Sequence, residues 1–96
     1  MRTKQDVINA ISEVQHPAIA YSLLELGIVK DVELDKNTAS VIFAFPFPNI
    51  PIADQLISSI YTHVNALGLE FQYAVTVMTE EEKARFMQME AEAWKG

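Results

Sequence analysis

The chain has few side chains that could do chemistry, and their spacing does not bring them together. It has no cysteine, so neither a disulfide nor a thiolate ligand can form. Its two histidines, His16 and His63, lie far apart and form no His-x-x-x-His pair. His63 falls at the border of an apolar helical stripe, which favours packing, and His16 precedes Pro17, which favours a turn. We therefore predict no metal site and no bound cofactor.

Motifs for nucleophilic catalysis and phosphate binding are also missing. No serine lies in a Gly-x-Ser-x-Gly sequence. The three glycines, Gly27, Gly68 and Gly96, are too dispersed to form a phosphate-binding loop. The acidic run 80–82 follows Thr79 in a capping-box pattern, so it indicates a helix start rather than a carboxylate site. The sequence predicts a protein that is not an enzyme.

The segment from Phe45 to Pro51 lies where an apolar strand ends and a helix begins, a place where proteins often build a site. Here it carries prolines and apolar side chains, Phe47 and Ile50 among them, instead of reactive groups. Two interpretations remain open for it. In the first, it is a rigid exposed lip that binds a partner, and its prolines lower the entropy cost of that binding. In the second, it is only a stiff connection between strand and helix.

Length and charge limit the classes of protein. Ninety-six residues with half of them hydrophobic predict one domain, spanning 1–96. A net charge of −6 disfavours nucleic acid and anionic membrane surfaces as partners. No apolar run approaches the roughly 20 residues that span a bilayer. The polar N-terminus shows no signal-peptide pattern, so we expect a cytoplasmic protein.

Periodicity predicts the elements in the order α-β-β-α-β-α. Helices are expected at 3–14, capped by Thr3, at about 51–66, and at the C-terminal 79–96, with one helical turn before Gly27. Strands are expected at 28–35, 38–45 and 70–78. Both alternating sets of side chains in 38–45 are apolar, which predicts a strand covered on both faces. Strand 70–78 is expected to place one face on the core. The fold class is α+β, a two-layer α/β sandwich with a three-stranded mixed sheet.

Four segments resemble the small iron–sulfur cluster assembly domains, a family that includes SufT, PaaD and the N-terminal domain of Mrp-type cluster-carrier ATPases. The resemblance covers about residues 5–78. It rests on VINAISEV at 7–14, on His16-Pro17 where the family has Asp-Pro, on LELGIVKDV at 24–32, and on FPNIP at 47–51, where the family often has Thr-x-Pro-x-Cys-Pro.

Two departures from the family pattern matter for function. The cysteine of the family falls on Ile50 and its aspartate on His16. Because an isoleucine cannot ligate iron, the resemblance implies an accessory or adaptor role in cluster assembly or metalloprotein maturation, with an iron–sulfur carrier or client protein as partner. The partner-binding residues that it implies are His16, Pro17, Leu26, Gly27, Phe47, Pro48, Asn49 and Ile50.

Two other functions remain open from the sequence. The first is that of a small accessory subunit of an oxygenase or hydroxylase system, which the PaaD resemblance allows. The second is that of a structural module that forms a homodimer through its last helix, which carries Met87, Met89 and Trp94.

Overall fold

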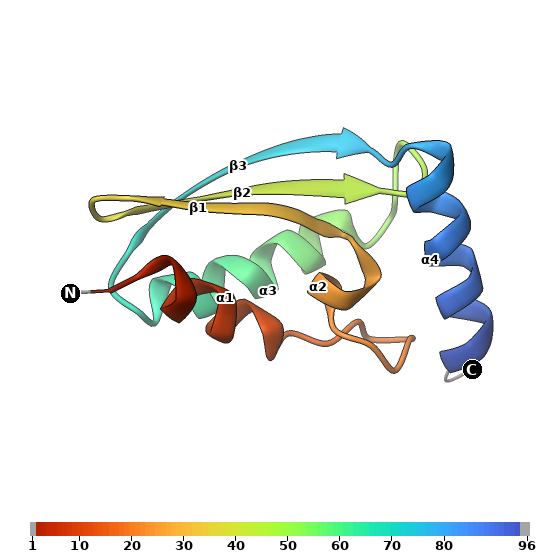
Figure 1. Ribbon diagram of the computed structural model, residues 1–96, viewed down its shortest axis with the longest axis horizontal. Helices are drawn as coiled ribbons and strands as arrows, with labels where there is room; N and C mark the ends of the chain where they lie inside the picture. The colour runs from red at the N-terminus through yellow and green to blue at the C-terminus, as the bar shows by residue number, and fades with distance from the viewer. Residues whose placement is uncertain (1, 95–96) are drawn as a thin grey trace.

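The protein is a three-stranded sheet with helices along one face and a further helix across one end (Figure 1). The computed structural model describes residues 2–94. The sheet order is β1-β2-β3, with β1 antiparallel and β3 parallel to β2. The predicted α+β sandwich with a mixed sheet is confirmed. The elements are α1 (Lys4–Ser12), α2 (Leu23–Leu26), β1 (Val29–Asp35), β2 (Thr38–Phe45), α3 (Ala53–Asn65), β3 (Glu70–Val77) and α4 (Glu80–Ala93).

Capping boxes begin three of the helices. The Thr3 hydroxyl accepts the Asp6 N–H, and the Asp6 carboxylate accepts the Thr3 N–H. The predicted box at Thr79 and Glu82 is confirmed. A third box, at Ser22, begins the short α2, which Gly27 ends in the left-handed conformation (φ 82°) that glycine adopts without strain.

Some helix ends differ from the predicted bounds. Helix α1 ends at Ser12 rather than at residue 14. Helix α3 begins at Ala53 rather than at about residue 51, because Pro51 and Ile52 lie in the turn before it. No side chain caps its first turn. Residues 95–96 of the predicted C-terminal helix lie outside the described residues. No helix within residues 2–94 is long and apolar enough to cross a membrane.

The core lies between the sheet and the apolar stripes of α1 and α3. Leu56, Ile60 and Val64 of α3 repeat every four residues, so they share the face that meets the sheet. From α1, Val7 and Ile11 are fully buried. The largest fully buried apolar side chains are Phe43, Ile11, Ile19, Leu23, Leu26, Ile28, Ile60, Val7, Val41 and Val64.

Two predictions about the sheet faces are wrong. Strand β2 is not covered on both faces, because Ile42 is 37% exposed on the face without α1 and α3. Strand β3 does not bury an apolar face, since Tyr73 and Val75 are 53% and 54% exposed. Alternation alone could not reveal this, because β3 is an edge strand that no further strand covers on its outer side.

Candidate functional site

The connection between β2 and α3 forms one wall of an apolar pocket. Strand β2 ends at Phe45, which is buried, and the chain then passes through the turn that contains Phe47 and Asn49. Asn49 has a positive φ of 61°, a conformation that asparagine tolerates better than most residues. The turn closes where the Ala53 N–H donates to the Ile50 carbonyl at 3.1 Å. This geometry sets Ile50 beside the end of β2.

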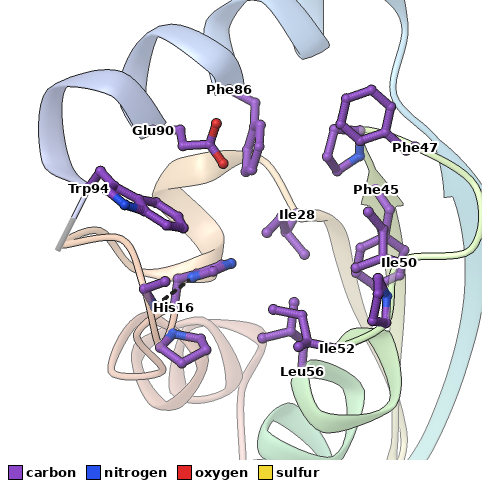
Figure 2. A pocket seen from close by; sticks show the side chains of 14 residues that line it. His16, Ile28, Phe45, Phe47, Ile50, Ile52, Leu56, Phe86, Glu90 and Trp94 are labelled. Atoms are coloured by element: carbon purple, nitrogen blue, oxygen red, sulfur yellow. Dashed lines mark hydrogen bonds between the residues drawn. The ribbon is translucent and has the colours of Figure 1, made fainter. Parts of the chain in front are cut away.

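Helix α4 forms the opposite wall. Phe86 and Glu90 of α4 are spaced by four and so lie on one helical face, and Trp94, the extended C-cap residue that follows the helix, continues this wall. Figure 2 shows the Glu90 carboxylate between the rings of Phe86 and Trp94, facing the side chains of Phe45, Ile50 and the start of α3. The space between the walls is about 410 Å³, within the range of small-molecule and side-chain pockets. Its lining residues are His16, Pro17, Ala18, Ile28, Phe45, Pro46, Phe47, Ile50, Pro51, Ile52, Leu56, Phe86, Glu90 and Trp94.

His16 is built into the turn that closes the pocket near Trp94. Its side chain is 7% exposed, and its Nδ1 accepts the Ala18 N–H at 3.0 Å. Its own backbone N–H donates to the Tyr21 carbonyl at 3.1 Å. Because Nδ1 is an acceptor, the neutral ring carries its proton on Nε2. His16 therefore has the turn role expected from the sequence, and its ring also lines the pocket.

The far end of α4 is tied to the same turn. The Ala20 N–H donates to the Ala93 carbonyl at 3.0 Å, and Ile19 and Trp94 form an isolated β-bridge. On the other wall, the Lys83 ammonium lies 4.3 Å from the centre of the Phe47 ring, a cation–π contact. Backbone bonds and this contact therefore hold α4 across the mouth of the pocket.

The near end of α4 is anchored by Glu82. Its Oε1 accepts the Thr79 N–H at 2.9 Å, and its Oε2 lies 3.4 Å from the Lys30 Nζ of β1. The Thr79 backbone hydrogen bond, followed by the charge of Lys30, holds the pKa of the Glu82 carboxyl below its ordinary value of 4.5, although burial opposes this.

We expect acid to weaken this anchor. Since the folded-state pKa of Glu82 is lowered, its contribution to stability is complete above the unfolded value of 4.5 and is lost as the pH falls through the folded value. Urea unfolding between pH 7 and about pH 3 measures this loss. The loss should be smaller in Glu82→Gln than in the wild type. Glu81→Gln is the control, because the Glu81 side chain has no hydrogen-bond or ion-pair partner among residues 2–94. An identical pH dependence in wild type and Glu82→Gln would contradict the assignment.

The structure brings together four of the eight residues predicted to bind a partner. His16, Pro17, Phe47 and Ile50 line the pocket. The other four lie elsewhere. Pro48 and Asn49 line a smaller depression between the turn and β3, and Leu26 and Gly27 lie beside another depression at the near end of α4.

Sequence reasoning missed the residues that α4 contributes. No pocket role was predicted from the sequence for Phe86, Glu90 or Trp94, and Phe86 is the one buried residue of this helix. Their spacing of four residues was a usable signal for a shared face. It could not show which part of the domain that face meets.

The donor atoms at the pocket do not fit an iron–sulfur cluster. The chain offers no thiolate, which such clusters require. The titratable side chains that line the pocket are His16 and Glu90. Within residues 2–94, no group of three or more His, Asp or Glu side chains could hold a metal ion.

Comparison with known proteins places this fold in a family. The family described as iron–sulfur cluster assembly protein matches residues 4–77, which is most of the chain and includes every strand. The chain belongs to the iron–sulfur cluster assembly protein family. Membership implies a role in iron–sulfur cluster assembly, in a family that is generally non-catalytic. Helix α4, which supplies one wall of the pocket, lies beyond the matched residues.

Two further proteins are similar to this chain in part of the sequence or in fold. An uncharacterized protein of Methanocaldococcus jannaschii is 43% identical over 35 residues, which are 36% of this chain and 37% of that protein. The match thus spans little more than a third of the curated relative. A domain of unknown function, DUF59, from Bacillus anthracis has the same fold, with a TM-score of 0.66, 19% identity, and coverage of 93% of this chain and 91% of that one.

Proposed function

We propose that this family member is a non-enzymatic adaptor in iron–sulfur cluster assembly or metalloprotein maturation, and that it docks a carrier or client protein at the pocket beneath α4. The observation that carries this proposal is the lining of the pocket. It is almost wholly apolar, it contains four of the residues expected to bind a partner, and it has no thiolate. Any cluster therefore stays on the partner.

The apolar walls suit an inserted side chain of a partner. Phe45, Leu56 and Phe86 are buried at the base of the pocket, while Phe47 is 43% exposed at its rim. An aromatic or aliphatic anchor that fills such a hollow supplies most of the binding energy in many interfaces. Pro46 and Pro51 stiffen the turn, so less conformational entropy is lost when the partner binds.

Charge favours a partner whose docking surface is basic. The chain carries a net charge of −6, and the Glu90 carboxylate lies at the pocket between two aromatic rings. A cation beside the anchor of the partner would pair with Glu90 in a partly desolvated setting. Such steering speeds association at low salt and weakens as the salt concentration rises.

The test measures binding of purified iron–sulfur carrier proteins before and after Ile50→Asp. A carboxylate on this wall would lose its hydration against the apolar anchor of the docked protein, with no hydrogen bond or cation to replace it. The affinity should therefore fall at least about 30-fold. Ile42→Asp is the matched control, since Ile42 lies on the open face of the sheet away from the pocket and should leave affinity unchanged. Circular dichroism checks that both variants fold.

Two outcomes would remove the proposal. Unchanged carrier affinity in a folded Ile50→Asp variant would exclude this pocket as the docking surface. A stable iron–sulfur chromophore after anaerobic reconstitution of the protein alone would exclude the claim that the cluster stays on the partner. The sole tryptophan, Trp94, lines the pocket, so a change in its fluorescence on mixing reports docking there directly.

A further inference from the structure

The outer edge of β3 carries free backbone groups in a regular pattern. The Glu70 N–H donates to the Asn37 carbonyl and the Met78 N–H to the Phe45 carbonyl, so even-numbered residues of β3 direct their N–H and C=O groups toward β2. Since these groups alternate along a strand, the odd-numbered residues direct theirs outward. No strand within residues 2–94 lies beyond this edge. The outward residues are Phe71, Tyr73, Val75 and Val77.

The same four residues form an apolar stripe on the face that bears α3, exposed at Tyr73, Val75 and Val77 and partly buried at Phe71. Ring contacts of Phe71 with Tyr61 of α3, and of Tyr73 with Phe43, place their side chains on this face. Tyr73, Val75 and Val77 are each about half exposed. Strand β3 also lacks the proline, lysine or bulge that commonly protects an edge strand. Unpaired backbone and exposed apolar side chains therefore coincide along one strand.

We propose that β3 pairs with β3 of a second copy of this chain, antiparallel, with Ala74 opposite Ala74 of the second copy. The two sheets would then form one six-stranded sheet about a twofold axis. This proposal is independent of the docking pocket, because Tyr73, Val75 and Val77 do not line that pocket.

The sequence of β3 is self-complementary in this register. Tyr73 lies opposite Val75 of the second copy, and Phe71 lies opposite Val77, so every outward residue forms a doubly hydrogen-bonded pair. Each of these pairs joins an aromatic side chain to a β-branched one, a combination that stabilises antiparallel strands. Ala74, the smallest side chain of the strand, occupies the closely spaced pair on the axis.

The opposite face raises no conflict. Gln72 lies opposite Thr76, and Glu70, the one charged residue of β3, lies opposite Met78, a buried residue just after the strand, rather than opposite a second carboxylate. Registers shifted by two residues leave Val77 or Phe71 facing a position outside the apolar stripe, whereas the proposed register pairs all four of its residues with one another. The strand thus fits a copy of itself better in this register than in its neighbours.

The first experiment measures the mass of the protein by analytical ultracentrifugation from about 1 μM to about 1 mM. The wild type should pass from monomer to dimer. Val75→Lys should raise the dimer dissociation constant at least about 10-fold, because a lysine would face Tyr73 of the second copy in each of two pairs. Thr76→Lys, one residue away on the other face, should change it little. A wild-type monomer throughout this range would overturn the proposal.

The second experiment fixes the register. The chain has no cysteine, so one introduced thiol can be oxidised without competition. In the proposed dimer the two residues 74 lie about 4.5 Å apart between Cα atoms, within disulfide range. Ala74→Cys should therefore form a covalent dimer under mild oxidation.

The matched control is Gln72→Cys. The two residues 72 would lie about 14 Å apart along the strands, too far for a disulfide, so this variant should stay monomeric on a non-reducing gel. Equal crosslinking of both variants, or none in Ala74→Cys while the wild type dimerises, would overturn the pairing. Dimerisation that Val75→Lys leaves intact would assign the interface to another surface, such as α4.

Discussion

Replacing Phe43 with alanine is expected to lower the free energy of unfolding by about 3–5 kcal/mol. Phe43 is fully buried at the middle of β2, stacks on Phe45 with ring centres 6.1 Å apart, and meets the edge of Tyr73 at 5.9 Å. A domain of this length has a total stability of about 5–14 kcal/mol. The variant would therefore keep only part of its stability, and urea unfolding followed by far-UV circular dichroism would measure the loss.

Ile42→Ala is the matched control for this prediction. Ile42 precedes Phe43 in the same strand, but its side chain is on the opposite face and 37% exposed. Its truncation should cost no more than about 1 kcal/mol. Equal losses in the two variants would contradict the assignment of the faces of β2.

Replacing Phe86 with alanine is expected to release α4 from the domain. Phe86 is the one buried residue of this helix, and its loss should cost about 3 kcal/mol. Because α4 covers the end of the sheet and lies outside the main helix layer (Figure 1), we expect the loss to appear as local opening. Amide exchange in residues 83–93 should rise about 100-fold.

Met87→Ala tests whether the effect depends on burial. Met87 follows Phe86 on α4 and is 44% exposed, so its truncation should leave exchange within about 3-fold of the wild type. The fluorescence of Trp94 should change in Phe86→Ala and not in Met87→Ala. If α4 exchanges equally fast in both variants, Phe86 does not hold it.

Local signals were enough to predict the elements of this fold. Thr3 and Thr79 begin helices because each hydroxyl meets an N–H three residues later, an interaction within one turn. The four-residue repeat of Leu56, Ile60 and Val64 likewise predicted α3 from residues that are close in the sequence. Exposure of β3 was not predictable, since Tyr73 and Val75 alternate with polar residues in an edge strand as they would in a covered one.

The candidate site was half predictable. The resemblance placed His16 and Ile50 together, and both line the pocket. Leu26 was expected there too, but it is the last residue of α2, is 1% exposed and packs into the core. Glu90 and Trp94 were missed, because only the tertiary path of the chain after β3 brings α4 back over the turn that precedes α3.

The pocket is assembled from two parts of the chain with separate structural duties. Residues 4–77 form the sheet and the helices that pack on it, whereas Phe86 and Glu90 stand on a helix that adds one buried side chain, and Trp94 is the C-cap of that helix. Substitutions along that helix can change the shape and charge of one wall with little effect on the folding of the rest. Under the proposed docking role, substitutions confined to α4 and Trp94 would change which partner fits the pocket while the scaffold stays constant.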